Sequence, residues 1–485
     1  MKVLYQIYRV LRSIIVSVVL SAVGLFSVFY LLLIMPGVQD SVRKVGESEL
    51  TKLLHVPVSI GQVSIKPFNR VSLEDVMVAD EKGDTILKVG ELGAGMSIYN
   101  LITKRRLVFT YAEIIDIDGR IWRDSVGAPL NIQPIIDALS KKDDKKEPAK
   151  FDVKIHNAVI RRGRVSYDVL DKPIISDRFD ANHIGVENFT ADIYFPKIRN
   201  NDFEVNVKRL ALREKSGFRL DKLSADVVVN DTLAALRRFR MELPNSLICP
   251  EDIELRYSSL ANIKSEIKTL PIRLRFPNCY VGMNDFACFN PMLSRFEEPL
   301  VFSFAVEGSL NDLHIPVLKL GKEDDSLGIS ISGNVSGLPD NDLHYSFPHF
   351  DVSATSSEIV NLANCFSPLK EKVAGIIENC KAIHLNGSAS GSATAAKYVG
   401  TVSTSVGNLA IDASAHFNKE SKRNTFSGAL STGNFNLGTL LGNNDLGALA
   451  LAMNVDVALA GKKLDGTFNS DLNYFDYKGY RYNNI

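Results

Sequence analysis

The chain has 485 residues, with 56 basic and 56 acidic side chains and a formal net charge of zero. A balanced charge gives no global field that would attract nucleic acid, so we expect no nucleic-acid partner. The five cysteines form no CxxC pair, which argues against a zinc site and favours buried thiols, although Cys279 with Cys288, or Cys365 with Cys380, could be oxidised together outside the cytoplasm.

The N-terminal region is dominated by an uncharged apolar stretch at residues 13–35. As a helix that rises ~1.5 Å per residue it would be roughly 33 Å long, which is enough to cross a bilayer. A cleaved signal peptide has a shorter apolar core, of about 7 to 15 residues, so the sequence favours an uncleaved transmembrane anchor. Basic side chains precede the stretch, and by the positive-inside rule they place residues 1–12 in the cytoplasm and the bulk of the chain on the far side of the membrane.

Residues 36–55 are predicted to form a short amphipathic helix. Val38, Val42 and Val45 recur at helical spacing within a segment rich in charged residues. Such a helix could lie beside the membrane surface or cap the end of a β core, and the two arrangements are compatible.

Beyond Val56 the sequence is dominated by a period of two, which is typical of strands with one apolar face. Residues 56–140 form the first predicted β segment. The clearest alternation in it covers residues 107–121, where apolar residues fall on odd numbers. Several strands change phase midway, as at Gly61 and Gln62, which predicts a β-bulge and a more twisted sheet.

A charged run divides the remainder of the chain. Residues 141–150 are predicted to be a solvated, mobile linker, and residues 151–326 a second β segment. Residues 327–485 form a Gly- and Ser-rich segment of repeated small strands, which favours a stacked or solenoid-like architecture. The strand pattern runs to the last residues without a capping element, so we expect a truncated version of a longer protein.

Three short helices are predicted to interrupt the strands. They cover residues 133–139, 231–239 and 355–380. The last is opened by a capping box at Thr355 and Glu358 and is broken by Pro368.

The sequence contains no signature of catalysis. It has no nucleophile elbow, no zinc-protease motif and no phosphate-binding loop, and its eight histidines are scattered along the chain. Asp116 and Asp118 could suggest paired carboxylates, but both fall on the polar face of an alternating strand, where solvated charges are the simpler interpretation. We therefore predict that the protein is not an enzyme and holds no cofactor or metal.

Several segments resemble a known family. The segment VSIGQVSIKPFNRVSLEDVMVAD at 58–80, which follows the predicted anchor and amphipathic helix, looks like the start of the AsmA-like proteins, specifically the TamB branch. Residues 155–167, 356–380 and 435–442 are similar to that branch too. The resemblance implies a mainly β fold, namely an elongated, twisted β-sheet groove, open along one side like a taco, with a few short helices. It also implies a single-pass inner-membrane protein with its bulk in the periplasm.

The same resemblance implies a role in outer-membrane biogenesis. In this family that role is the movement of phospholipid between the membranes, and help in assembling outer-membrane proteins together with an Omp85-type barrel. The sequence covers the N-terminal portion of the family and lacks the large C-terminal domain that meets the outer membrane in full-length members. This leaves the barrel partnership open for this chain.

A lipid role would explain the predicted apolar strands. An acyl chain that leaves a bilayer loses about 0.8 kcal/mol for each exposed CH₂ group, so a transit path needs an apolar lining, and an alternating strand supplies one side chain in two. The alternative is a structural or scaffolding envelope protein, whose apolar face is an ordinary closed core without lipid. The side chains predicted to line the lipid groove are Leu107, Phe109, Tyr111, Ile115, Ile117, Ile121, Phe189, Ile193, Phe195, Val227 and Val229.

Overall fold

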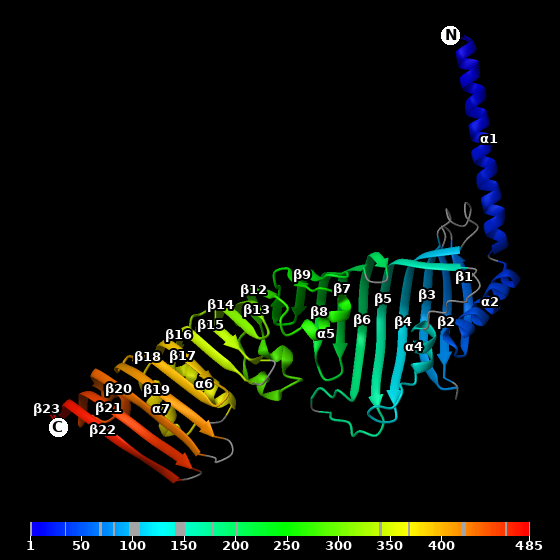
Figure 1. Cartoon of the computed structure of the whole chain (residues 1–485). Coiled ribbons are helices and arrows are strands. Elements are labelled where there is room, and N and C mark those ends of the chain that lie inside the picture. The colour runs from blue at the N-terminus through cyan, green and yellow to red at the C-terminus, as the bar shows by residue number, and fades with distance from the viewer. Residues whose placement is uncertain are drawn as a thin grey trace. The chain divides into compact units, whose positions relative to one another are not determined.

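The computed structural model describes residues 2–33, 35–66, 70–80, 83–96, 107–140, 151–176, 178–199, 202–338, 342–366, 369–418, 423–460 and 463–484. The described part is mainly β, as predicted, with short helices between some of the strands (Figure 1). The chain divides into two compact units: unit 1 comprises residues 1–196 and 207–219, and unit 2 comprises residues 197–206 and 220–485. The predicted linker at 141–150 lies outside the described residues.

In its described residues, unit 1 is an open sheet with helices α1, α2 and α4. Strands β1 to β4 pair antiparallel in chain order, β4 pairs parallel with β5, and β5 pairs antiparallel with β6. A parallel pair needs a long crossover, and helix α4 lies in the segment that joins β4 to β5. The elements are α1 (Lys2–Leu33), α2 (Pro36–Leu54), β1 (Val58–Lys66), β2 (Arg70–Ala79), β3 (Thr85–Met96), β4 (Leu107–Arg123), α4 (Gln133–Ser140), β5 (Phe151–Val169), β6 (His183–Arg199) and β7 (Asp202–Glu214), the last two of which cross the unit boundary.

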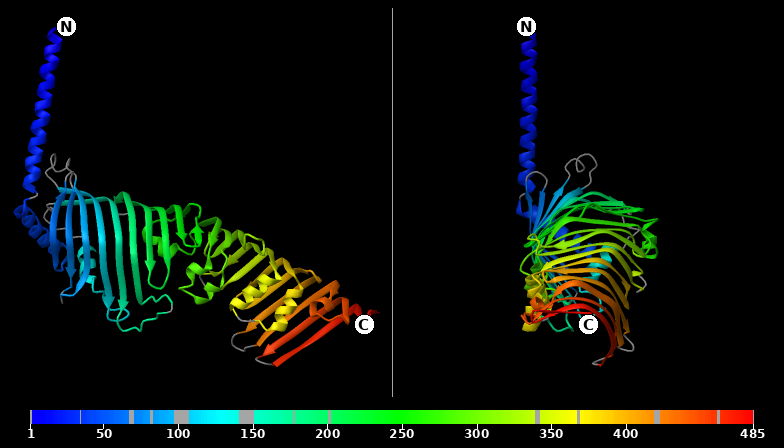
Figure 2. Two further views of the ribbon diagram at one scale, coloured as in Figure 1. Left: turned by 180° about the vertical axis from the view of Figure 1, so that it is seen from behind. Right: turned by 90° about the vertical axis from the view of Figure 1, so that its left-hand side faces the viewer.

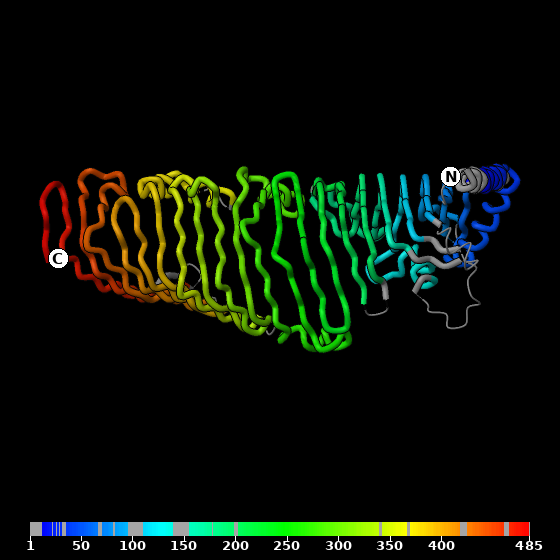
Figure 3. The backbone as a smooth tube through the Cα atoms, turned by 90° about the horizontal axis from the view of Figure 1, so that it is seen from above, coloured from blue at the N-terminus to red at the C-terminus, as the bar shows by residue number. Residues whose placement is uncertain are grey.

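Within unit 2, antiparallel strands follow one another in chain order from β12 to β23, side by side in the tube view (Figure 3). Its strands are β8 (Arg219–Val229), β9 (Leu233–Leu243), β10 (Ser246–Ile248), β11 (Ile253–Arg256), β12 (Ile272–Val281), β13 (Leu300–Ser309), β14 (Asp312–Gly321), β15 (Leu327–Ser336), β16 (His344–Thr355), β17 (Ala382–Ser392), β18 (Ala395–Thr404), β19 (Gly407–Asn418), β20 (Arg423–Asn436), β21 (Leu446–Ala460), β22 (Lys463–Tyr477) and β23 (Tyr480–Asn483). Its helical turns are η1 (Leu260–Asn262), α5 (Ile263–Glu266), η2 (Met283–Phe286), η3 (Pro291–Arg295), α6 (Ser356–Phe366), α7 (Glu371–Asn379) and α8 (Leu437–Leu441).

Two of the three predicted helical interruptions are confirmed. Residues 133–139 form most of α4, and residues 355–380 contain α6 and α7, which join the end of β16 to the start of β17 (Figure 2). Thr355 caps α6, because its Oγ1 accepts the backbone N–H of Glu358 at 3.3 Å. Pro368 lies outside the described residues.

The predicted helix at 231–239 is wrong, because residues 233–239 lie at the start of strand β9. Leu236 pairs with Val227 of β8 on one side and with Ile253 of β11 on the other. A ladder on both sides satisfies the backbone of β9, and this tertiary pairing overrides the helical spacing of a few leucines.

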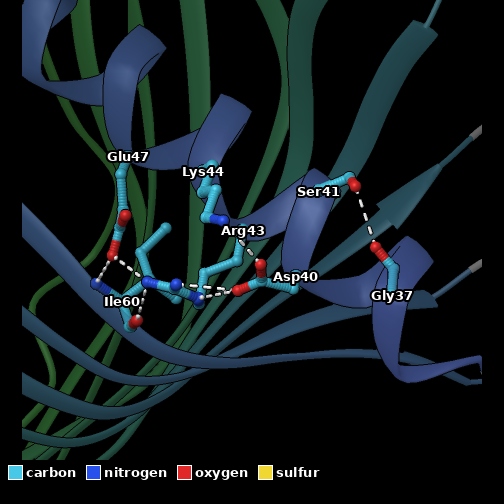
Figure 4. Close-up of polar contacts among 7 residues, drawn as sticks. All are labelled: Gly37, Asp40, Ser41, Arg43, Lys44, Glu47 and Ile60. Carbon is cyan, nitrogen blue, oxygen red and sulfur yellow. Dashed lines mark hydrogen bonds and ion pairs between the residues drawn. The ribbon is translucent and has the colours of Figure 1, made fainter.

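Helix α2 forms as predicted and caps the β core at edge strand β1. Leu50 and Leu54 pack against the buried cluster of β1 to β3. The Glu47 carboxylate accepts the backbone N–H of Ile60 at 2.9 Å, and Arg43 donates to Glu47 at 2.8 Å (Figure 4). These contacts occupy backbone groups that an edge strand would otherwise expose. The predicted position beside a membrane surface stays a prediction.

Among the described residues, none of the helices combines the length and the apolar character that a membrane crossing requires. The predicted anchor at 13–35 overlaps α1. It includes positions 22, 26, 29 and 32–34, which lie outside the described side chains. The anchor therefore stays a prediction.

A line of six residues, one on each strand from β1 to β6, combines left-handed residues with glycines that lie close to two of them, and we call it the crease. Its non-glycine residues have φ between 51° and 56°, in the left-handed region, where such residues are uncommon. From β1 to β5 each crease residue stands level with the crease residue of the neighbouring strand, and on β6 Asn188 precedes Phe189, the partner of Gly163. The crease consists of Gly61, Asp75, Gly90, Asp116, Arg162 and Asn188.

The crease explains the change of phase that the sequence shows near Gly61. A one-sided β-bulge is not found there, because the β1–β2 register continues unbroken from Ile60 paired with Val76 to Gln62 paired with Glu74. Instead, the alternation of side chains between the two faces shifts in both strands at the same position, Gly61 in β1 and Asp75 in β2. A Cβ on Gly61 would lie 3.0 Å from the Cβ of Asp75, so the close approach requires glycine.

Candidate functional site: the apolar face of the sheet

In unit 1 the crease keeps apolar side chains of β4 on one face on both sides of Asp116. Ile114 precedes the crease residue of β4 and Ile117 follows it, yet both pack against the same buried cluster, which contains Val63 and Val76. An ordinary strand would place residues of even and odd number on opposite faces. The left-handed Asp116 reverses the alternation, so the apolar face continues past it.

The prediction that all odd-numbered residues of 107–121 share one face is therefore wrong. Ile115 lies on the opposite face from Ile117, because Asp116 separates them. Tyr111 shares the face of Ile115, and the Arg70 guanidinium lies 6.0 Å from the centre of its ring. Arg70 also contacts Glu113 on that face. The side chains of Leu107 and Phe109 lie outside those that the structure describes.

The remaining predicted residues of unit 1 are brought together on the apolar face. Ile117 and Phe189 meet over Gly163, where an added Cβ would lie 3.0 Å from Ile117 and 3.1 Å from Phe189. Ala158 pairs with Ile193, and Ile160 pairs with Ala191, which is fully buried. The alternation on this face then continues through Ile117, Ile121, Phe189, Ile193 and Phe195.

Val227 and Val229 belong to unit 2 and lie on β8. They pair with Leu236 and Ala234 of β9, and both are half-buried. Asp226, which precedes Val227, accepts a hydrogen bond from Asn206 at 2.8 Å and contacts Arg238. That Val227 and Val229 line a lipid groove stays a prediction.

From β12 onward, unit 2 carries cross-strand rows of apolar residues, because paired residues of an antiparallel sheet point to the same face. Row 1 crosses ten strands, and each member pairs with the next: Phe276, Phe304, Leu318, Ile331, Phe350, Gly387, Gly400, Ile411, Leu430 and Met453. Row 2 runs beside it on the same face: Cys279, Phe302, Leu320, Ile329, Val352, Leu385, Val402 and Leu409.

The opposite face of the same strands is polar. A row of hydrogen-bonding side chains crosses it in register, from Lys319 through Ser330 and Asp351 to Asn386. Asp351 accepts hydrogen bonds at 2.8 Å from Asn386 and, with a protonated ring nitrogen, from His384. These bonds, led by that from Asn386, lower the pKa of the Asp351 carboxyl. The sheet of unit 2 therefore has one polar and one apolar surface.

The apolar surface is only partly covered by other segments. The described residues place fully buried clusters near the strand ends, where α6 packs over Leu300, Leu327 and Ala354, and where α8 contributes Leu440 to the cluster of Val406 and Phe435. Every member of row 1, by contrast, is half-buried. An ordinary closed core would bury such side chains completely.

In the middle of row 1, two glycines lie beside the side chain of Tyr398. Gly387 pairs with Gly400, which leaves two neighbouring positions without side chains. The Tyr398 hydroxyl lies 2.6 Å from the Cβ position of Gly400 and donates toward the carbonyl oxygen of Asn386 at 3.3 Å. Burial raises the pKa of Tyr398, so the phenol stays neutral and this part of row 1 carries no charge.

A polar cavity of about 510 Å³ lies next to α6. Lys322 Nζ stands between Glu298 at 2.9 Å and Glu358 at 2.8 Å. Burial acts to lower the pKa of Lys322, but the bonds to the two carboxylates outweigh it and raise the pKa. Arg295 donates to the carbonyl oxygen of Cys365 at 2.9 Å, at the other end of α6. Both cations thus fix α6 in place.

One buried group has no signal in the sequence. His183 is 4% exposed and stands between two acceptors, the Asp168 carboxylate at 2.9 Å from Nδ1 and the Lys172 carbonyl oxygen at 3.0 Å from Nε2. Two acceptors require two N–H donors, so the ring is an imidazolium. It holds the loop after β5 against β6. Sequence reasoning missed it because the loop and the strand meet only in the fold.

Among the described residues, no group of three or more His, Cys, Asp or Glu side chains is placed to hold a metal ion. Comparison of the chain with protein-family models, with curated proteins and with solved structures gave no match. Rows 1 and 2 are made of uncharged residues throughout.

Proposed function

We propose that the apolar face binds the acyl chains of phospholipid and that the protein serves the transfer of lipid between the inner and outer membranes. It would do so as a non-enzymatic, inner-membrane-anchored protein of the periplasm, in the manner of the AsmA-like proteins of the TamB branch. The observation that carries this proposal is the half-buried state of every member of row 1. An apolar surface left partly open to water gains about 25 cal/mol per Å² when a guest covers it.

The anchor is part of the proposal. Helix α1 exposes apolar side chains around its surface, and Leu20 and Leu25 have exposed fractions of 65% and 75%. Large apolar side chains gather in this way on surfaces that contact lipid or protein. We place α1 in the inner membrane, with residues 1–12 in the cytoplasm and the sheet in the periplasm. Help in assembling outer-membrane proteins, with or without an Omp85-type barrel, remains a further proposal.

A scaffolding protein with a closed core is the competing function. The clusters beneath α2, α6 and α8 favour it locally, because they are packed by the protein itself. Row 1 favours lipid binding, because its side chains are only half-buried by the protein itself.

A matched pair of substitutions separates the two functions. Ile331 lies in row 1, whereas Ser332 is its neighbour on the opposite face and pairs with His349. The full-length protein is purified in a mild detergent and its bound phospholipid is measured by mass spectrometry. We expect phospholipid with the natural protein and with Ser332→Asp, and a severalfold loss with Ile331→Asp. Lipid-free natural protein that is folded by circular dichroism would support the scaffold instead.

A further inference from the structure

The polar cavity next to α6, which we call the α6 cavity, has an excess of negative charge. Of the described residues that line it, four are carboxylates and two are cations, which leaves two negative charges unbalanced when all are ionised. These six residues are Arg295, Lys322, Glu297, Glu298, Asp324 and Glu358. A cationic group would balance part of this excess.

One ammonium group already shows how the α6 cavity holds a cation. Lys322 Nζ lies between the carboxylates of Glu298 and Glu358, at 2.9 Å and 2.8 Å. The side chain of Glu358 is 8% exposed and that of Lys322 is 16% exposed, whereas that of Glu298 is 61% exposed. A carboxylate has about four lone-pair sites, so the open Glu298 can accept hydrogen bonds from a second ammonium.

A buried hydroxyl group in the lining has no partner. Ser326 lines the α6 cavity, and its buried Oγ makes no hydrogen bond in the part of the chain that the structure describes. Buried polar atoms normally contact protein, water or a ligand. The hydroxyl therefore offers a further contact to a polar guest.

The α6 cavity adjoins the apolar face. Leu300 lines the cavity and belongs to the buried cluster beneath α6. Leu320 and Ile329, two members of row 2, pack against the same cluster. A molecule with a cationic polar end and an apolar tail therefore fits the cavity and row 2 together.

Arg295 adds a group that suits a phosphate. Its Nη1 donates to the carbonyl oxygens of Cys365 at 2.9 Å and Asn364 at 3.4 Å, and the residue is exposed. A guanidinium carries five N–H donors in a planar fork, which matches the geometry of a phosphate. The α6 cavity thus offers carboxylates for an ammonium and a guanidinium for a phosphate.

We propose that the α6 cavity binds the zwitterionic head group of an aminophospholipid, with the ammonium against Glu298 and the phosphate near Arg295. This assignment rests on the proposed function, because the acyl chains of the same lipid lie on row 2. Phosphatidylglycerol has the same phosphate but a neutral glycerol in place of the ammonium. Its net negative charge is repelled by the excess of carboxylates, so the α6 cavity selects phosphatidylethanolamine over phosphatidylglycerol.

A competition between these two lipids tests the assignment. The full-length protein in mild detergent is mixed with equal amounts of phosphatidylethanolamine and phosphatidylglycerol of identical acyl chains, repurified, and its bound lipids are counted by mass spectrometry. We expect severalfold enrichment of phosphatidylethanolamine with the natural protein, and a ratio near one with Glu298→Gln at unchanged total lipid. Glu323→Gln is the matched control and should keep the enrichment, because Glu323 is exposed, carries the same charge and lies outside the described lining.

The outcomes separate this inference from the proposed function. A natural protein without any bound lipid would overturn both. Bound lipid without enrichment, or enrichment that survives Glu298→Gln, would overturn the head-group site alone. Phosphoethanolamine, added by itself, should leave the melting temperature unchanged, since it lacks acyl chains. A rise in melting temperature that Glu298→Gln abolishes would assign the α6 cavity to a soluble amine and overturn the lipid assignment.

Discussion

At the level of single residues, the apolar face depends on a few positions where no side chain fits. Gly163 is the clearest, because Ile117 and Phe189 pack directly over it. Replacing a small residue by a larger one in such a contact forces its neighbours off their preferred positions.

We predict that Gly163→Ala destabilises the protein by about 1–3 kcal/mol, the range for overpacking. The added Cβ would sit about 3 Å from Ile117 and Phe189, which is closer than carbon atoms normally approach. Urea unfolding followed by circular dichroism measures the effect. Gly433→Ala is the control, since nothing lies within 4 Å of its Cβ position. Equal midpoints for the two variants would contradict the account of this contact.

We expect the stability of the folded protein to depend on pH through His183, whose pKa is raised. The hydrogen bond to Asp168 is the largest cause of its raised pKa, and Asp180 adds to the rise. A group with a raised folded pKa contributes stability that is complete below its unfolded pKa and is lost as pH rises through the folded pKa. The carboxylates of Asp168 and Asp180 and the ammonium of Lys215 are the charges that face this loop.

We therefore predict that His183→Gln destabilises the protein more at pH 6 than at pH 9. The imidazolium donates two hydrogen bonds at the lower pH and loses one donor at the higher. Urea midpoints of the natural protein and the variant across this range measure the difference. His349→Gln serves as control, because His349 is exposed. A difference that grows with pH would show that the ring is neutral in the folded protein.

At the level of elements, the crease decides which face each strand of unit 1 presents. Asp116 and Arg162 lie in it and form two hydrogen bonds of 2.7 Å. The bond from Arg162 lowers the pKa of Asp116. Aspartate tolerates the left-handed region better than β-branched residues do.

We predict that Asp116→Val costs about 1–3 kcal/mol of stability, the range for a strained backbone conformation. Asp118→Val is the matched control two residues along the same strand, where the backbone is not left-handed. Unfolding midpoints of the two variants provide the comparison. If Asp118→Val were the more damaging change, the left-handed backbone of the crease would not be what matters.

Much of the fold could be predicted from the sequence, because alternation is a local property. It predicted the strands around Phe189 and Val227 and the mainly β class. Alternation could not predict the face of Ile115. The sequence does not show that Asp116 is left-handed, because that conformation depends on the neighbouring strands. The rows of unit 2 could not be predicted either. They depend on the register between strands, such as the pair of Phe350 with Gly387, and a single strand does not fix its register.

At the level of the whole molecule, the proposed binding of acyl chains depends on the continuity of the apolar face. Row 1 crosses ten strands, from Phe276 to Met453, without a charged side chain. Each CH₂ group that leaves water on such a surface gains about 0.8 kcal/mol. A chain of ordinary length would therefore be held without any specific polar contact.

Photocrosslinking tests this claim most directly. A photoreactive amino acid is placed at Phe350, in row 1, or at His349, its exposed neighbour on the polar face, and the full-length protein is irradiated in phospholipid vesicles. We predict phospholipid adducts at position 350, found by mass spectrometry, and few at position 349. Equal labelling at both positions, or no lipid adduct at position 350 in folded, vesicle-bound protein, would contradict the account.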